Sequence, residues 1–213
     1  MSSSTESTTY LNLLAGDQQD LVSEAETLDL GQDLAAADAV GKILRAIGVA
    51  AADTGNTGEG DISGEALGAH SKIGTYTATC TAIGAPAVFA VVDPDGERLA
   101  DAVAEVAYDG PIAFLIEAYG VAFAVGDIFT VIVGAGSLEV TALDSTAVDG
   151  SEDIYGVLAE DCDASLAATP CTVYTKGEFN RDVVGFTGTD TYATYQAEAR
   201  KIGIIFRDTV SAA

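Results

Sequence analysis

The sequence of 213 residues predicts a mainly β protein: an α+β core with one helix toward its C-terminal end and a small all-β domain inserted into it. Three observations support this fold class. Hydrophobic residues make up 48% of the chain, enough for a buried core, but only 7% are aromatic and Trp is absent. Glycine is frequent, with 23 copies. The apolar runs are short and bounded by turn-forming residues, which is typical of strands.

The first 22 residues are predicted to be a flexible arm. Residues 1–10 (MSSSTESTTY) are polar and lack the basic and apolar regions of a signal peptide, so we expect none. Four apolar side chains stand close together in the middle of this arm: Tyr10, Leu11, Leu13 and Leu14. A polar segment of this kind is suited to ordering on contact with a partner. The arm is therefore a candidate binding segment.

Residues 23–52 begin the core, and their secondary structure is ambiguous from propensity. Residues 24–30 (EAETLDL) alternate as in a strand, and Gly31-Gln32-Asp33 predicts a turn. Residues 34–45 are rich in Ala, so intrinsic propensity alone also allows a helix there. Gly41 lies inside this run and weakens the helical alternative.

Residues 53–147 form an acidic segment that we expect to be an inserted domain. The segment contains 14 acidic and 2 basic residues, and its net charge of −12 is half of the total of −24. Both of its edges are rich in Gly, Asp, Ser and Thr: residues 53–60 (DTGNTGEG) and residues 143–153 (LDSTAVDGSED). This composition is typical of linkers.

The apolar residues of the middle segment recur with a period of two. Residues 75–79 (TYTAT) alternate, and the apolar run 88–92 leads into residues 93–96 (DPDG), in which Pro fixes φ and Gly supplies a positive φ. This pattern predicts a hairpin. Further strands are expected at 112–116 and 128–133, which gives an all-β module of about five or six strands.

The C-terminal part completes the core and contains the one predicted helix. Strands are expected at 154–159, 171–175 and 204–206. The helix is predicted over 191–202, with Asp190 as its N-cap and Gly203 directly after its last residue. Its apolar face consists of residues at steps of three and four: Tyr192, Tyr195, Ala199 and Ile202.

The charge of the chain argues against two classes of partner. With 9 basic and 33 acidic residues the chain repels polyanions, so we expect neither nucleic acid nor an anionic membrane as a partner. The longest apolar stretch, residues 121–133, is interrupted by Gly126 and Asp127. It is shorter than the roughly 20 residues that a membrane helix needs, so we expect no membrane span.

No catalytic constellation is evident. His70 is the only histidine and stands in a loop of small residues (LGAHSKIG). The three cysteines, Cys80, Cys162 and Cys171, lack C-x-x-C spacing and are expected to be core residues, with a late disulfide between Cys162 and Cys171 as the alternative. The glycines of residues 58–64 do not have the spacing of a nucleotide-binding loop. We therefore expect no enzyme and no cofactor.

Close carboxylates occur at residues 53–56 (DTGN) and 161–163 (DCD). Neither segment matches the twelve-residue calcium loop with its terminal Glu. Among 33 acidic residues such pairs are expected by chance, so we interpret them as part of an acidic surface and expect no dedicated metal site.

Residues 156–186 and 199–208 contain a pattern of residue types at fixed spacings. They are Gly156-Val157-Leu158, Asp161-x-Asp163-Ala164, Pro170, Val173-Tyr174, Gly177-Glu178-x-Asn180 and Gly203-Ile204. This pattern resembles the head decoration proteins of tailed bacteriophages, the lambda-type capsid-stabilising family. Residues 26–32, which include Gly31, and residues 39–43 (AVGKI), which include Gly41, are similar to a turn and the following strand of that family. The resemblance favours β structure over a helix in this region.

The resemblance implies a discontinuous core of residues 23–52 and 148–213, with residues 53–147 inserted into a surface loop. It further implies a structural protein that binds the outer surface of the expanded head as homotrimers, with the major capsid protein as its partner. The arm is then expected to add a strand to a capsid sheet while its four apolar side chains fill pockets. The expected locations are the virion surface and, during assembly, the host cytoplasm.

Two other functional classes remain open at this stage. One is a virion or cell-surface adhesin whose inserted domain binds a glycan or a host receptor. The other is a carboxylate-dependent hydrolase, which no residue pattern in the sequence supports. The excess of acidic over basic residues is also compatible with a salt-loving host, which concerns habitat rather than function.

Overall fold

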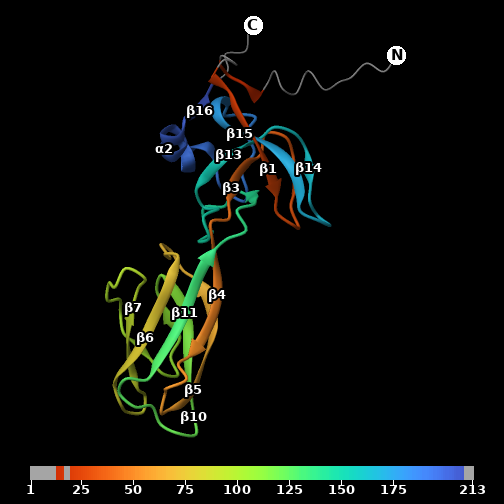
Figure 1. Cartoon of the computed structure of the whole chain (residues 1–213). Coiled ribbons are helices and arrows are strands. Elements are labelled where there is room, and N and C mark those ends of the chain that lie inside the picture. Colours follow the sequence, from red (N-terminus) through yellow and green to blue (C-terminus); the bar gives the residue numbers. More distant parts are fainter. Residues whose placement is uncertain (1–12, 17–19, 209–213) are drawn as a thin grey trace. The chain divides into compact units, whose positions relative to one another are not determined.

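The chain folds into two compact units, seen in a computed structural model that describes residues 13–16 and 20–208. Unit 1 contains Met1–Ile43 and Leu138–Ala213, and unit 2 contains Leu44–Ser137 (Figure 1). Almost all regular structure is β strand. The helix α2 (Tyr192–Ile202) is the one helix whose bounds lie wholly within the described residues. The predicted mainly β fold with a helix in its C-terminal part is confirmed.

Five strands of unit 1 close into a small barrel. They follow the order β1-β12-β3-β13-β15, and β15 pairs back to β1. The strands are β1 (Val22–Leu28), β3 (Ala39–Lys42), β12 (Val140–Ala142), β13 (Ile154–Leu158) and β15 (Thr169–Asn180). Of these pairings β1–β12 is parallel and the others are antiparallel. Because the ring is closed, none of these five strands is left as an edge.

A short ribbon and a crossover complete unit 1. The ribbon pairs β2 (Asp33–Leu34) with β14 (Cys162–Asp163). The last four residues of β15 pair in parallel with β16 (Ile204–Arg207), so α2 lies in the connection between two parallel strands. The helix ends at Gly203, whose φ of 89° places it in the left-handed region that glycine adopts without strain.

The N-terminal end of α2 differs from the prediction. The N-cap residue is Thr191, not Asp190. The Asp190 carboxylate instead accepts hydrogen bonds from the Ser145 N–H at 2.9 Å and the Tyr195 hydroxyl at 2.5 Å. It therefore links the helix to the loop that follows β12. Tyr195 and Ala199 are buried as expected for the apolar face, whereas Ile202 is 46% exposed.

Two hydrophobic clusters build unit 1, one on each face of the barrel wall. The first includes Leu28, Val140, Val40, Leu158 and Val173. Because these residues come from all five barrel strands, this cluster fills the barrel interior. The second cluster, called the outer cluster below, packs α2 and part of the N-terminal segment against the outside of the barrel. It includes Leu13, Leu143, Phe179, Tyr195, Ala199 and Ile204.

Unit 2 is an antiparallel β-sandwich. One sheet has the order β4-β11-β6-β7-β8 and the other the order β5-β10-β9. The strands are β4 (Arg45–Ala52), β5 (Glu59–Leu67), β6 (Gly74–Ala82), β7 (Val88–Val92), β8 (Ala102–Val103), β9 (Tyr108–Asp109), β10 (Ile112–Tyr119) and β11 (Ile128–Ala135). The strands expected at 75–79, 88–92, 112–116 and 128–133 are present as β6, β7, β10 and β11. Unit 2 contains four further strands, β4, β5 and the short β8 and β9, so it has more strands than the five or six predicted.

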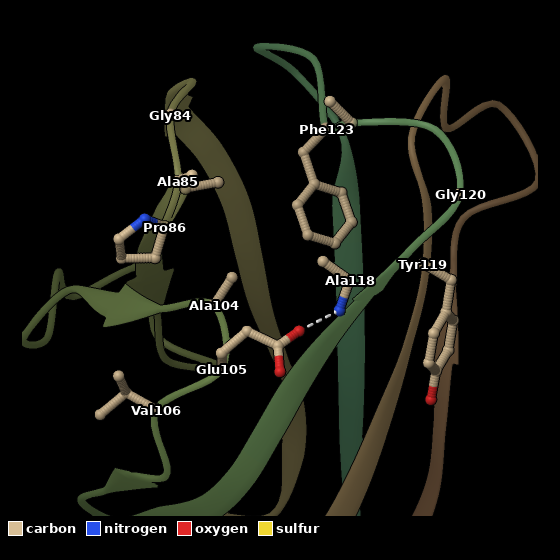
Figure 2. Close-up of a pocket in the computed structure, with 12 residues that line it drawn as sticks. Gly84, Ala85, Pro86, Ala104, Glu105, Val106, Ala118, Tyr119, Gly120 and Phe123 are labelled. Atoms are coloured by element: carbon tan, nitrogen blue, oxygen red, sulfur yellow. Dashed lines mark hydrogen bonds between the residues drawn. The ribbon is translucent and has the colours of Figure 1, made fainter.

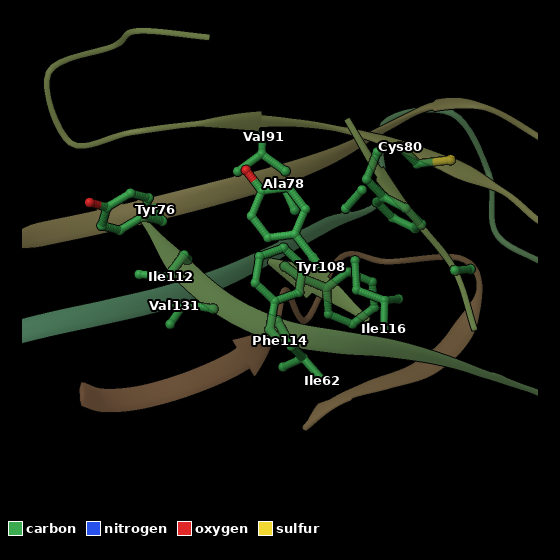
Figure 3. Close-up of a cluster of buried hydrophobic side chains, with 14 of the residues drawn as sticks. Ile62, Tyr76, Ala78, Cys80, Val91, Tyr108, Ile112, Phe114, Ile116 and Val131 are labelled. Carbon is green, nitrogen blue, oxygen red and sulfur yellow. The ribbon is translucent and has the colours of Figure 1, made fainter. Parts of the chain in front are cut away.

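The core of unit 2 is aromatic although the chain as a whole is not. Phe89 packs edge to face against Phe123 and Phe129, with ring centroids 5.2 and 5.7 Å apart. Tyr108 and Phe114 stack at 4.7 Å, and Figure 3 shows their rings between the two sheets. Aromatic pairs in these geometries contribute about 0.5–1.5 kcal/mol each beyond their buried area.

The boundaries of unit 2 lie earlier in the chain than the predicted boundaries 53 and 147. β4 belongs to unit 2 because it pairs along its length with β11. Residues 138–147 belong to unit 1, where β12 is a barrel strand and Leu143 is fully buried. The Ala-rich residues 34–45 contain β3 and the start of β4 and form no helix.

The two polar segments interpreted as linkers are packed parts of the units. In residues 53–60 the Asn56 side chain donates to the Ile128 carbonyl at 2.8 Å and accepts from the Ile128 N–H at 2.7 Å. This pairing fixes the turn that carries the chain from one sheet of the sandwich to the other. In residues 143–153 Ser151 is buried, and its backbone lies directly against Gly41.

Candidate functional site

The glycines that carry the family resemblance all occupy positions in unit 1 that a side chain would disturb. A Cβ on Gly41 would lie 2.3 Å from the Ser151 carbonyl oxygen, and one on Gly156 would lie 2.3 Å from a methyl group of Val173. Gly31 has a φ of 92° in the turn after β1. Together with Gly203, these glycines determine turns and close strand packing rather than a binding surface.

The polar residues of the motif hold loops of unit 1 in place. Asp161 accepts a hydrogen bond from the Ala36 N–H at 2.8 Å, and Asp163 accepts one from the Ser165 N–H at 2.9 Å. Hydrogen bonding by Ser165 keeps the pKa of Asp163 below its usual value. Asn180 is buried, and its side-chain oxygen accepts from the Asp182 N–H at 3.1 Å.

Two further motif residues, Pro170 and Glu178, lie on β15. Pro170 stands near its beginning, opposite Thr27 of β1. Glu178, near its end, forms an ion pair with Arg207 of β16, which raises the pKa of Arg207. These contacts join neighbouring strands, so the resemblance identifies residues that build the fold of unit 1.

The arm is only partly described, and the described part is not free. Tyr10 and Leu11 lie outside the described residues. Leu13 is buried in the outer cluster of unit 1, and Leu14 forms a β-bridge with Phe179, next to a hydrogen bond of 2.9 Å from the Ala15 N–H to the Glu178 carbonyl. The expectation that Leu13 and Leu14 are available to fill pockets of a partner is therefore corrected: Leu13 stabilises the protein's own core.

A polar cluster at one end of the barrel was not anticipated from the sequence. Lys42 forms an ion pair of 2.8 Å with Glu26, and its ammonium group lies 4.5 Å from the centre of the Tyr155 ring. The Tyr155 hydroxyl lies within hydrogen-bond distance of two carboxylates, Glu26 and, at 2.8 Å, Glu24, which share its single proton. The sequence does contain one signal for this cluster. Alternate residues of a strand share a face, so Glu24 and Glu26 lie on the same face of β1 as the buried Leu28.

The protonation of this cluster follows from its contacts. Burial by itself raises the pKa of Glu26, but hydrogen bonds from Lys42 and Tyr155 and the charge of Lys42 outweigh burial and lower it. Burial and the two carboxylates raise the pKa of Tyr155. Glu26 therefore stays ionised and Tyr155 stays protonated at neutral pH. The cluster stabilises the barrel end and leaves no group poised for proton transfer.

The catalytic candidates of the sequence are not brought together. His70 lies in an exposed turn with a φ of 63°. The three cysteines are buried and form no disulfide, and burial is the main cause that raises the pKa of Cys171 to about 11. Within residues 13–16 and 20–208 there is no group of three or more His, Cys, Asp or Glu that could hold a metal ion. That part of the chain also contains no helix long and apolar enough to cross a membrane.

A pocket of about 590 Å³ lies in unit 2 (Figure 2). It is formed by residues 84–87, which follow β6, by residues 104–106, and by residues 118–120, 122 and 123 at the end of β10 and just after it. The first and last residues of unit 2, Leu44 and Ser137, lie next to the paired residues Arg45 and Ala135. This pair is at the end of the sandwich opposite to the pocket. The lining is mostly apolar, with Glu105 as its one charged side chain and Tyr119 as its one hydroxyl, so the pocket is a candidate ligand site of unit 2.

Comparison with known proteins gives little information on function. No protein-family model and no curated protein matches the chain. Two crystal forms of FlgL from Xanthomonas campestris align with 21% and 22% identity over 52% and 49% of this chain, each with a TM-score of 0.32. The chain spans about a third of the length of these structures, covering 33% and 32%. Similarity at this level does not establish a shared fold.

Proposed function

We propose that the protein is a structural, non-enzymatic protein that binds the exterior of the expanded phage head as trimers and stabilises the capsid lattice. The observation that carries this proposal is that every described residue of the decoration-protein pattern lies in unit 1, where it forms a turn, a close packing contact or a bond between strands. The family pattern therefore coincides with one compact unit.

The position of the N-terminal segment supports strand addition as the mode of binding. Leu14 and Ala15 pair with one side of the end of β15, while β16 pairs with the other. The described residues Leu14 and Ala15 thus lie at the margin of a sheet. A chain that leaves a sheet margin is well placed to pair with the exposed strand of another protein, and main-chain hydrogen bonds would supply the affinity.

Co-sedimentation with phage heads tests this proposal. Purified protein is mixed with expanded heads and, as the control, with unexpanded heads of the same phage. We expect the protein to sediment with expanded heads alone, with trimeric density at local three-fold positions in electron micrographs. Equal sedimentation with both head forms, or with neither, would overturn the proposal.

The pocket of unit 2 favours a second candidate function, that of an adhesin at the virion or cell surface. Such a function needs a ligand site on the inserted unit, and the pocket provides one of sufficient volume. The two functions are compatible, because the pattern residues belong to unit 1 and the pocket belongs to unit 2.

A further inference from the structure

Exposed apolar side chains lie in or next to the segments that line the pocket of unit 2. Val106 lines the pocket and is 55% exposed. Ile83 and Val121 directly adjoin lining residues and are 68% and 48% exposed, and Val125, two residues after Phe123, is 66% exposed. Isolated apolar residues are common on surfaces, but an apolar hollow with an apolar rim is typical of a surface that a partner covers.

Glu105 supplies the single charge of the pocket lining. Its N–H donates to the Ile116 carbonyl at 2.8 Å, and one carboxylate oxygen accepts from the Ala118 N–H at 2.5 Å (Figure 2). The described residues offer no partner to its second oxygen. The backbone φ of 63° at Glu105 is unusual for a residue with a side chain, and these two bonds to β10 hold it there. Glu105 is exposed, so its second oxygen is open to solvent and to a ligand. A charged carboxylate held in a fixed position therefore faces an apolar hollow.

The charge of unit 2 is complementary to a cation. Leu44–Ser137 contains 12 acidic and 3 basic residues. Lys72 pairs with Asp93 and Asp95, and Arg98 pairs with Asp101. The field of the unit thus attracts positively charged ligands and repels anionic ones.

We propose that this pocket binds a peptide segment of a partner protein in which apolar side chains flank a lysine or arginine. The apolar side chains would occupy the hollow between Pro86, Ala104 and Phe123, and the cation would pair with the free oxygen of Glu105. A glycan fits this lining less well, because its hydroxyl groups need several polar partners and the lining provides one charged side chain. This inference deepens the adhesin alternative and does not depend on capsid attachment.

The test uses two matched peptides and the full-length protein. The acetylated and amidated peptides Ala-Leu-Lys-Leu-Ala and Ala-Leu-Glu-Leu-Ala are titrated into isotope-labelled protein, and amide chemical shifts are recorded by NMR. We expect the lysine peptide to shift the amide signals of Glu105, Ala118 and Gly120 and to bind about tenfold more tightly than the glutamate peptide. We also expect the difference to decrease at high salt.

Two substitutions locate the interaction. Glu105→Gln keeps the oxygen that the Ala118 N–H needs and removes the charge, so it should weaken the lysine peptide about three- to fivefold while the protein stays folded. Asp109→Asn makes the same change of charge at an exposed carboxylate that does not line the pocket, and it should leave binding unchanged. Val106→Ser should weaken both peptides, because it removes part of the apolar wall.

Three results would overturn the proposal. They are the absence of any shift up to the solubility limit of the lysine peptide, equal affinities for the two peptides, and equal effects of Glu105→Gln and Asp109→Asn. Co-sedimentation with expanded heads is measured on the same variants. If the unsubstituted protein sediments with expanded heads but does not bind the lysine peptide, this inference alone is refuted. If it binds the lysine peptide but does not sediment with expanded heads, capsid attachment alone is refuted.

Discussion

Asp127 is a buried carboxylate that organises the end of unit 2 next to the pocket. Its oxygens accept hydrogen bonds from the backbone N–H groups of Thr57, Gly58 and Ala124, each between 2.8 and 2.9 Å. Burial by itself raises the pKa of Asp127, but these three bonds outweigh burial and lower it. A single side chain thus joins the turn after β4 to the loop before β11.

We expect Asp127→Asn to destabilise unit 2 by about 1–3 kcal/mol, because an amide cannot accept from all three N–H groups and leaves a buried donor unpaired. The pKa of Asp127 is lower in the folded than in the unfolded chain. Its contribution is therefore complete well above the ordinary carboxyl value of 3.8 and is lost as the pH falls below it. Urea unfolding at pH 7 and pH 3 measures both effects, with Asp109→Asn as the control. A stability difference that does not shrink at pH 3 would contradict this account.

Gly156 tests the role of the motif glycines. A Cβ there would lie 2.3 Å from Val173 and 2.7 Å from the Tyr174 carbonyl oxygen, inside the wall of the barrel. We expect Gly156→Ala to destabilise unit 1 by about 3 kcal/mol through overpacking. Gly31→Ala meets no atom within 4 Å and should cost only about 1 kcal/mol for the positive φ. Thermal unfolding of both variants checks that Gly156→Ala is the more destabilising substitution. Equal losses of stability would show that close packing at Gly156 does not add to the cost of the substitution.

At the level of single residues, the sequence predicted the glycines better than the carboxylates. Gly203 follows a helix whose periodicity is visible, so its left-handed conformation was predictable. Asp190 precedes that helix by the expected spacing, yet it bonds to Ser145 and Tyr195. The Ser145 contact joins residues distant in sequence. No local pattern contains it, and the same holds for Asp127 and the turn after β4.

At the level of elements, the N-terminal segment shows what was missed. The polar composition of residues 1–22 predicts a flexible arm, but Leu13, Leu14 and Leu21 anchor its described part to unit 1. Leu13 is 3% exposed among side chains of the outer cluster. The strand β4 was missed for a related reason: its sequence RAIGVAAA is compatible with a helix by propensity, and only its pairing with β11 determines its conformation.

Two truncations separate anchoring from binding in the arm. Deletion of residues 2–12 removes Tyr10 and Leu11 but retains the contacts of Leu13 and Leu14, so we expect unchanged melting and loss of co-sedimentation with expanded heads. Deletion of residues 2–16 also removes the buried Leu13 and should destabilise unit 1 by about 2–4 kcal/mol. Full sedimentation of the shorter truncation would exclude the arm as the capsid-binding segment.

At the level of the whole molecule, the sequence revealed an inserted domain but not its boundaries. Charge and composition separate the acidic middle from the rest, whereas the polar segments chosen as linkers are turns fixed by long-range bonds. The true insertion point has a specific geometry. The Leu138 N–H donates to the Ile43 carbonyl and the Ile43 N–H donates to the Glu139 carbonyl, both at 3.0 Å, and Leu138 has a φ of 64°. The same bonds and the same positive φ close a hairpin with a three-residue loop that ends in a left-handed bulge residue. In this chain residues 44–137 stand in place of the first two residues of such a loop.

This geometry predicts how unit 2 can be removed. Replacing residues 44–137 with Pro-Asp and introducing Leu138→Gly recreates a tight hairpin between β3 and β12, because Gly adopts the positive φ that Leu138 now adopts. We expect the shortened protein to keep the thermal stability of unit 1 and its sedimentation with expanded heads. Expressed alone, residues 44–137 should fold cooperatively, since their aromatic core is complete within the unit.

A deletion at the polar segments provides the control for this removal. Replacing residues 56–142 with a Gly/Ser loop removes β12 from the barrel and leaves β4 without β11, so we expect it not to fold. Circular dichroism, thermal melting and sedimentation compare the two deletions. If both deletions fold equally well, β12 is dispensable and the barrel is not the cooperative unit. If neither folds, unit 1 depends on unit 2, and the insertion is part of a single folding unit.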